Sequence, residues 1–222
     1  MKGNHSRVEE SETRFVRFKI VCTSIPVMIK IFPTPLFLEN SIALLKPLER
    51  ADFDQLTELG LQPALWAMNP RKVETREDML AYLEEAICEK QNGISIPFVI
   101  YDKRTGEMAG STRYSNLFTA HKRLEIGWTW INTRFQRTGL NRAVKFELLK
   151  YGFETLDLNR IELKTDALNT QSRMAMKKIG ATEEGIFRKH MVTHSGRVRD
   201  TVYLSILRAE WEVIRAKIFS EF

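Results

Sequence analysis

The sequence predicts a mixed α/β fold, in which a central sheet of parallel and antiparallel strands has helices on both faces. Strand-like segments follow one another at residues 94–101, 107–116 and 124–131, and the short turns between them favour antiparallel hairpins. A long helical pattern then leads to another strand at residues 160–166. A strand–helix–strand connection makes its two strands parallel, with a right-handed crossover.

One strand and two helices are expected before the hairpins. Residues 42–49 form a strand-like run that leads to Asp52, a residue type that favours the start of a helix. Apolar residues recur at helical spacing after Asp52 and again over residues 76–91, where Asn92-Gly93 ends the pattern.

The later part of the chain alternates between the two kinds of element. Apolar residues from Leu140 to Leu156 trace a long helix. The remaining segments are, in order, a helix at residues 169–179, strands at residues 184–191 and 199–207, and a terminal helix at residues 209–222. The sequence therefore predicts one domain over residues 42–207, followed by the terminal helix.

The strand at residues 124–131 has two kinds of side chain in alternation. Period-two alternation places each set on its own face of a strand. The apolar set is Leu124, Ile126, Trp128 and Trp130, and the other set is Glu125, Gly127 and Thr129. Glu125 is therefore expected beside Gly127 and Thr129, away from the tryptophans.

Composition excludes several classes of protein. The chain has 222 residues, 43% of them apolar and 28% charged, which is typical of a soluble globular protein, and no apolar run is long enough to cross a membrane. The net charge is +6, but residues 1–35 carry half of this excess, so binding of nucleic acid is disfavoured. Cys22 and Cys88 lack the spacing of a metal site. We expect a cytoplasmic protein without a metal.

Residues 1–35 differ in composition from the rest and are expected to form a flexible or extended leader. Basic residues precede an apolar run at residues 20–29, which has the outline of a secretory signal peptide. The run lacks a small-x-small cleavage site, and Pro26 interrupts it, so secretion is disfavoured. Translation from Met28 is a further alternative.

The segment Gln136-Arg137-Thr138-Gly139-Leu140-Asn141 joins a strand to the start of a helix. Free N–H groups and the helix dipole favour a phosphate at such a position. Gly139 allows a close approach of the backbone, and Arg137 adds positive charge. An ordinary strand-to-helix connection is the competing interpretation, because one glycine is a weak signal.

This loop resembles the Q/R-x-x-G-x-G/A motif of the GNAT acetyltransferase superfamily, with Asn141 where the family has Gly or Ala. The segment Glu125-Ile126-Gly127-Trp128 is similar to a strand of the branch that contains ribosomal-protein N-terminal acetyltransferases. Asn169-Thr170-Gln171-Ser172, followed by Lys178-Ile179-Gly180-Ala181, resembles a helix of the same branch. The resemblance covers residues 42–207 and implies a GNAT-like fold.

The resemblance implies transfer of an acetyl group from acetyl-CoA, as co-substrate, to an amine by direct attack. The acceptor stays open between a protein α-amino group and a small-molecule amine, and a homodimer is left open. The residues implied in binding CoA are the strand backbone at Trp130 and Ile131, the loop and helix start at Gln136, Arg137, Thr138, Gly139, Leu140, Asn141 and Arg142, and the side chain of Asn169.

Four residues are candidates for the chemistry. Glu125 is the first choice as general base, with a structural ion pair as the alternative. His121 is the second candidate, because an imidazole titrates near neutral pH, although a solvated loop histidine is the simpler interpretation. Ser172 is suited to hydrogen-bond the CoA sulfur, or to bond back to its own helix. Tyr203 is a weaker candidate for an acid.

Two other functions remain alternatives to the enzyme. A CoA-binding module without catalysis, acting as a sensor or partner, would need the loop but not Glu125 or Ser172. A basic nucleic-acid-binding protein would show salt-dependent binding of DNA at physiological ionic strength.

The composition of the leader generates a first prediction. A chain that begins at Met28 is expected to keep the melting temperature and the acetyl-transfer activity of the full chain, because residues before it carry no pattern of a buried core. Thermal unfolding and a turnover assay check this. A large loss of either would show that the leader packs on the domain.

Overall fold

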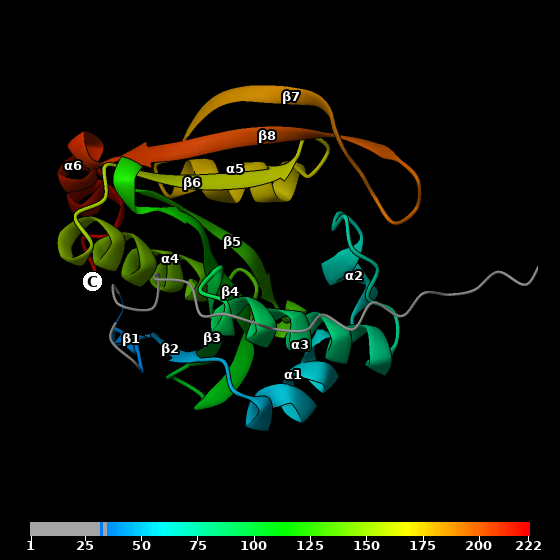
Figure 1. Ribbon diagram of the computed structural model, residues 1–222. Helices are drawn as coiled ribbons and strands as arrows, with labels where there is room; N and C mark the ends of the chain where they lie inside the picture. The colour runs from blue at the N-terminus through cyan, green and yellow to red at the C-terminus, as the bar shows by residue number, and fades with distance from the viewer. Residues whose placement is uncertain (1–31, 33–34) are drawn as a thin grey trace, which may run out of the picture.

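The computed structural model describes residue 32 and residues 35–222, which include one eight-stranded mixed sheet (Figure 1). The strand order across the sheet is β1-β2-β3-β4-β5-β6-β8-β7. The strands are β1 Leu38–Glu39, β2 Ala43–Pro47, β3 Ser95–Asp102, β4 Glu107–Phe118, β5 Arg123–Ile131, β6 Arg160–Asp166, β7 Thr182–Val192 and β8 Val198–Leu207. Within the described residues, β5 and β6 pair in parallel and the other neighbours are antiparallel. The predicted mixture of strand directions is confirmed.

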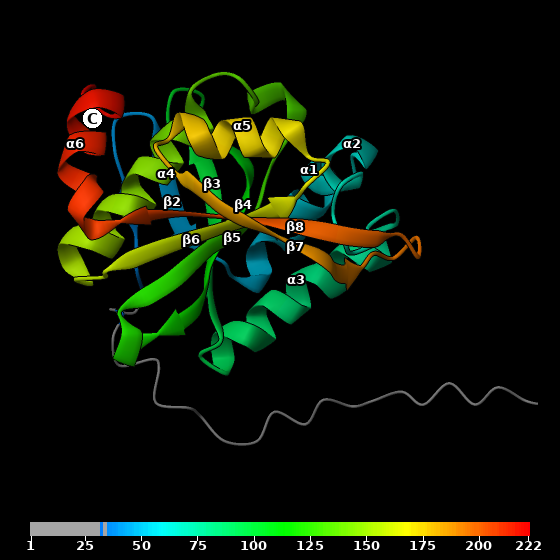
Figure 2. The ribbon, with the colours of Figure 1, turned by 90° about the horizontal axis from the view of Figure 1, so that it is seen from above.

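Helices cover both faces of this sheet, as predicted (Figure 2). They are α1 Phe53–Gly60, α2 Pro63–Trp66, α3 Arg76–Gln91, α4 Leu140–Lys150, α5 Thr170–Lys178 and α6 Arg208–Ile218. The core under α1–α3 includes Leu56, Trp66 and Leu83. The core under α4 and α6 includes Leu140, Phe146 and Trp211, and Met176 of α5 packs against it. The two cores lie on opposite faces of the sheet.

Local signals in the sequence explain where several helices begin and end. The side chain of Thr75 accepts a hydrogen bond from the amide of Asp78 at 3.1 Å, which starts α3 at Arg76. The predicted long helix after the loop is α-helical over Leu140–Lys150 and continues as a π-helical turn over Tyr151–Thr155. The short strand β1 and the single-turn helix α2 were not predicted, because neither is long enough to show a period.

The packed part of the chain reaches further toward the N-terminus than residue 42. The ring of Phe32 lies 6.2 Å from those of Tyr114 and Tyr151, and Leu36 is buried in the core under α4. The proposed signal-like run at residues 20–29 and the alternative start at Met28 lie outside the described residues.

The strand β5 carries one extra residue relative to β4. Gly127 is opposite Arg113 and Trp130 is opposite Ser111, so two residues of β5 face the single residue Thr112. Trp128, in this β-bulge, has a φ of 50°, a left-handed conformation that is uncommon for a residue other than glycine.

The bulge overturns the predicted alternation of β5. Leu124 and Ile126 belong to the core under α4, whereas Trp130 belongs to the core under α1–α3. Thr129 consequently faces α4, where it accepts a hydrogen bond from Lys145. The prediction of one apolar face was wrong because an extra residue shifts the period-two pattern by one position.

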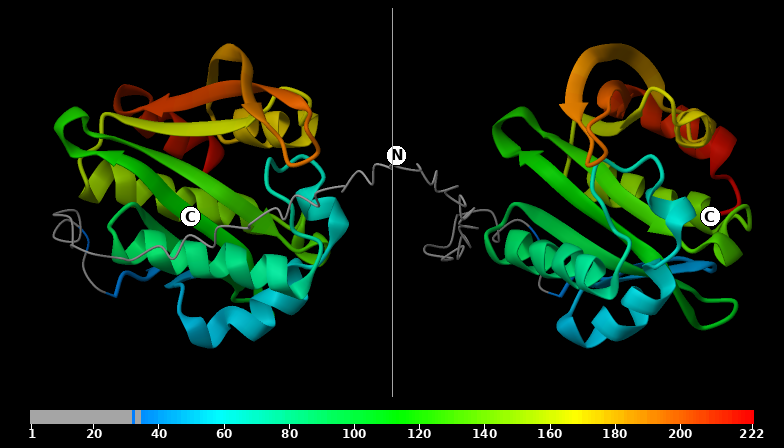
Figure 3. Two further views of the ribbon diagram at one scale, coloured as in Figure 1. Left: turned by 45° about the vertical axis from the view of Figure 1, so that its right-hand side comes forward. Right: turned by 90° about the vertical axis from the view of Figure 1, so that its right-hand side faces the viewer.

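Beyond its first three residues, β5 separates from β6. The parallel pairing joins Arg123, Leu124 and Glu125 to residues 160–162 and extends no further. Figure 1 and Figure 3 show the two strands close together at one end and apart at the other. The second half of β5 therefore has an edge that is not paired with β6.

The close approach of β4 to the bulge generates a prediction about stability. A Cβ atom at Gly110 would overlap the carbonyl oxygen of Trp130. Gly110→Ala is therefore expected to lower the free energy of unfolding by about 3 kcal/mol, measured by denaturant titration. Gly185→Ala is the matched control, because within the described part of the chain no atom lies within 4 Å of the position its Cβ would take. Equal effects of the two substitutions would contradict the packing described at Gly110.

Candidate active site

The loop between β5 and α4 has the geometry of an anion-binding turn. Arg137 and Gly139 adopt left-handed backbone conformations, with φ values of 62° and 87°. Arg137, Thr138 and Gly139 are exposed, and no atom of the described residues lies within 4 Å of the position of a Cβ at Gly139. Gly139 is the N-cap of α4 and has no side chain to cap the first amides. These amides are available to hold a phosphate at the positive end of the helix dipole.

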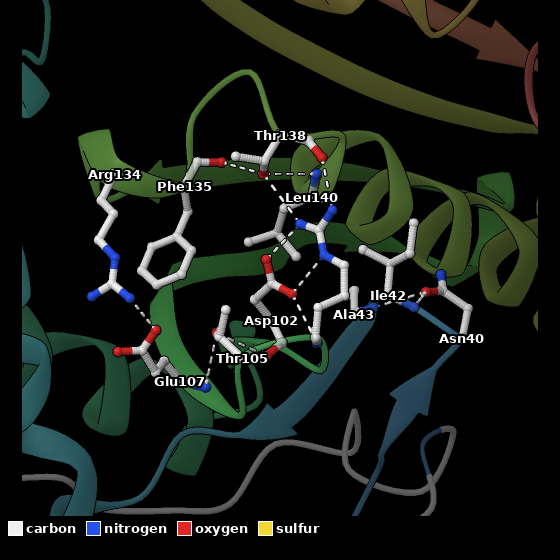
Figure 4. A network of polar contacts seen from close by, with 11 residues as sticks. Asn40, Ile42, Ala43, Asp102, Thr105, Glu107, Arg134, Phe135, Thr138 and Leu140 are labelled. Carbon is white, nitrogen blue, oxygen red and sulfur yellow. Dashed lines mark hydrogen bonds and ion pairs between the residues drawn. The ribbon is translucent and has the colours of Figure 1, made fainter.

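An ion pair from a neighbouring turn holds this loop (Figure 4). Arg104 donates hydrogen bonds to the carbonyl of Thr138 at 3.0 Å and to its hydroxyl at 3.3 Å. Asp102 accepts from Arg104 Nε at 2.9 Å, and this guanidinium keeps the pKa of Asp102 below its ordinary value. The hydroxyl of Thr138 in turn donates to the carbonyl of Phe135 at 2.7 Å. Thr138 therefore shapes the loop through both its side chain and its backbone.

Gln136 connects three elements at the same end of the sheet. Its amide nitrogen donates to the carbonyl of Ile131 at 2.9 Å, and its amide oxygen lies 3.4 Å from the side-chain nitrogen of Gln171. The structure thus brings the start of α5 to the loop before α4. It also occupies the Ile131 carbonyl, one of the backbone groups expected to contact CoA, with a side chain of the protein.

Asn169 and Ser172, both predicted to lie at the CoA site, form a helix cap at the start of α5. The side-chain oxygen of Asn169 accepts a hydrogen bond from the amide of Ser172 at 2.9 Å, so Asn169 is the N-cap of α5. The side chain of Ser172 is half-buried.

Glu125 is buried, with 6% of its surface exposed, on the sheet face opposite α4. Its Oε2 accepts hydrogen bonds from Lys164 Nζ and from Asn116 Nδ2, both at 2.7 Å. Within the described part of the chain, Oε1 has no hydrogen-bond partner, and it lies 3.2 Å from the position of a Cβ at Gly127. The predicted proximity of Glu125 and Gly127 is confirmed, and the ion pair that was weighed against catalysis is present.

The other predicted residues lie in different environments. His121 is exposed in the turn between β4 and β5, at the opposite end of β5 from the loop before α4. Arg142 is paired with Glu221 near the C-terminal end. Tyr203 lies on the same face as Lys164, whose Nζ is 4.8 Å from the centre of its ring.

Sequence reasoning missed a group of residues around the bulge. Arg113, only 1% exposed, lies over the rings of Tyr82 and Trp128 at 4.7 and 5.7 Å. Burial raises the pKa of Tyr82, whose hydroxyl donates to the Trp128 carbonyl at 3.5 Å. On the other face, Lys145 is buried and donates to Thr129 Oγ1 at 2.8 Å. The available signal for Lys145 was a charged residue within the apolar stripe of α4.

The described residues contain no group of three or more His, Cys, Asp or Glu side chains suited to a metal. The same residues include no helix long and apolar enough to cross a membrane.

Comparisons with known proteins agree with this geometry. Residues 43–182 match the family described as "Acetyltransferase (GNAT) domain". The chain is 32% identical to "Putative ribosomal N-acetyltransferase YdaF" of Bacillus subtilis, over 78% of this chain and 95% of that protein. It is also similar to the crystal structure of a "putative acetyltransferase" from T. thermophilus, with a TM-score of 0.76 and 27% identity, over 86% of this chain and 99% of the other.

A more distant structure shares the fold. "Mycobacterium smegmatis RimJ in complex with CoA-disulfide" has a TM-score of 0.66 and 23% identity, over 76% of this chain and 83% of that one. With the family match over most of the described chain, these similarities identify the protein as an enzyme of the GNAT family of N-acetyltransferases.

Proposed function

We propose that this protein transfers the acetyl group of acetyl-CoA to a primary amine, and that the α-amino group of a protein is the acceptor to test first. One observation carries the proposal. We call residues 136–139 the phosphate-binding loop. This loop lies on one side of the bulge in β5, and Glu125 Oε1, which has no hydrogen bond among the described residues, lies on the other. At the bulge, β5 has already separated from β6.

The loop supports the binding of CoA. The exposed amides around Gly139 are suited to the pyrophosphate, and the absence of atoms near this glycine leaves room for it. The second half of β5, including the backbone of Trp130, offers an edge for the pantetheine arm. Asn169 would act indirectly, as the cap that fixes the start of α5.

The carboxylate and the bulge support the chemistry. Glu125 Oε1 would take a proton from the attacking amine, directly or through a water, while Lys164 and Asn116 hold Oε2 in place. A backbone N–H of the segment at residues 128–131 would donate to the oxyanion that forms at the acetyl carbonyl. Ser172 would donate to the departing sulfur, and Tyr203 is the second candidate for this role.

Two features favour a protein α-amino group as the acceptor. An α-amino group has an ordinary pKa near 8, so about a tenth is neutral at pH 7 and a base has to assist only modestly. The relative YdaF of Bacillus subtilis is named "Putative ribosomal N-acetyltransferase".

Turnover separates this proposal from a CoA-binding module without catalysis. Release of CoA from acetyl-CoA is measured with a panel that contains peptides with free N-termini, polyamines and other small amines. Turnover with peptides supports a protein α-amino group as the acceptor. Turnover only with small amines would show that the acceptor is a small-molecule amine instead. Binding of CoA without turnover on any amine would favour the non-catalytic module.

The first prediction from this proposal concerns binding. Gly139→Asp places a side chain and a negative charge against the pyrophosphate, so the affinity for CoA is expected to fall at least tenfold, or about 1.4 kcal/mol, in calorimetry. Gly196→Asp is the matched control, because Gly196 also has a positive φ, of 79°, and open space around it. Unchanged affinity in a folded Gly139→Asp protein would refute the assignment of the loop.

The second prediction concerns catalysis. Glu125→Gln is expected to lower kcat by about 10²–10⁴ with CoA binding intact, because the amide cannot accept the proton. The loss should shrink as pH rises through the pKa of the amine, since the neutral amine then attacks without a base.

The control for Glu125 is another buried carboxylate. Asp52→Asn weakens a pair with Lys46 at 2.7 Å, at the start of α1, and should leave kcat unchanged. A loss that is constant up to high pH would indicate that Glu125 positions other groups, and full activity at neutral pH would remove it from the mechanism.

A further inference from the structure

Lys145 is a buried cation that the proposed reaction does not use. It lies on α4, 5% exposed, and its one hydrogen bond among the described residues is the 2.8 Å contact from Nζ to Thr129 Oγ1. Burial alone lowers its pKa to about 7, and no carboxylate pairs with it in the described part of the chain. An ammonium group has three donors, so two of them have no partner among these residues. Such a group costs stability where an apolar side chain of similar size would not.

One turn earlier on the same helix, Asn141 has a hydrogen-bond acceptor that lacks a donor. Its side-chain oxygen is buried and has no hydrogen-bond partner among the described residues. Residues four apart lie on the same face of a helix, so Asn141 and Lys145 are neighbours along α4. The face thus offers unused donors and an unused acceptor about one helical turn apart.

The position of this pair relates it to the proposed cofactor site. Asn141 lies in the first turn after the phosphate-binding loop. Lys145 contacts Thr129, which follows the bulge residue Trp128 and lies beyond the part of β5 that pairs with β6. Asn141 and Lys145 therefore lie one after the other along α4, from the phosphate-binding loop toward the bulge of β5.

We propose that Lys145 and Asn141 bind the pantetheine arm of CoA, with Lys145 donating to an amide carbonyl and Asn141 Oδ1 accepting from an amide N–H. The inference rests on the proposed binding of acetyl-CoA. The arm has two secondary amides, which supply both kinds of group between the pyrophosphate and the thiol. Asn141 stands where the resemblance leads us to expect Gly or Ala, so its side-chain acceptor departs from that motif.

The test compares CoA with 3′-phospho-ADP, the part of CoA that lacks the pantetheine arm. Lys145→Met should lower the affinity for CoA about tenfold, as expected for a hydrogen bond from a charged group, and leave the affinity for 3′-phospho-ADP unchanged. Asn141→Ala should lower the affinity for CoA about threefold, again without an effect on 3′-phospho-ADP. Gly139→Asp is the contrasting variant, because it should weaken both ligands.

Proton exchange provides a readout that a structural role would not move. Donation to a carbonyl favours the ammonium form, so binding should raise the pKa of Lys145 and take up a fraction of a proton between pH 7 and 8. Calorimetry in buffers of different ionisation enthalpy measures this uptake. Lys145 bonds to the neutral hydroxyl of Thr129 on β5, which in turn bonds to the neutral hydroxyl of Thr112 on β4, and burial alone shifts the pKa of Lys145. Lys145→Met should therefore abolish the uptake. Proton uptake on binding of 3′-phospho-ADP measures any contribution that the phosphates make.

Stability and a second variant keep the test decisive. Lys145→Met should melt at the same or a higher temperature, because it removes a buried charge. Thr129→Val removes the observed partner of Lys145 and should retain most of the affinity for CoA. If this variant lost as much CoA affinity as Lys145→Met, the proposal would be overturned. Equal losses for CoA and 3′-phospho-ADP, or no loss, would overturn it while leaving the proposed function intact. A wild-type chain that binds neither ligand would overturn both.

Discussion

The extra residue of β5 opposite Thr112 turns the second half of the strand over, and contacts on both faces hold it there. On the α4 face, the hydroxyls of Thr112 and Thr129 lie 2.7 Å apart and Lys145 bonds to the latter. On the other face, Tyr82 bonds to the Trp128 carbonyl. A left-handed conformation at a tryptophan costs free energy, and it persists only where the surroundings determine it, which is typical of functional sites.

Two buried charged groups lie on opposite faces of β5. Glu125 precedes it and forms its ion pair on the face away from α4, whereas Lys145 reaches Thr129, after the bulge, from α4 itself. Had β5 continued as a regular strand, Thr129 would have shared the face of Glu125. The bulge thus supplies Lys145 with a hydroxyl partner on the α4 face, while the ion pair of Glu125 lies on the other face. In the proposed reaction this allows the base to act on the amine while the lysine contacts the cofactor.

The sequence predicted the order and type of the long elements because their period is local. The helix at residues 76–91 carries its own cap and stop signals, and the crossover from β5 to β6 follows from chain connectivity. The faces of Trp128 and Thr129 could not be predicted, since a bulge depends on the register with β4, which the period of a single strand does not contain. Lys145 was missed for a related reason, because a lysine in a helix usually lies on its exposed face.

Several buried polar atoms have no hydrogen-bond partner among the described residues. Of the six buried side-chain atoms without a partner among the described residues, three belong to Arg113, Trp130 and Asn141, which lie on β4, β5 and the start of α4. Unpaired polar groups of this kind lower stability. Asn141 follows the loop before α4, which Arg104 and Asp102 hold in shape. A ligand that meets the side-chain oxygen of Asn141 gains a hydrogen bond without displacing one of the protein, and little of its binding energy is spent on ordering the site.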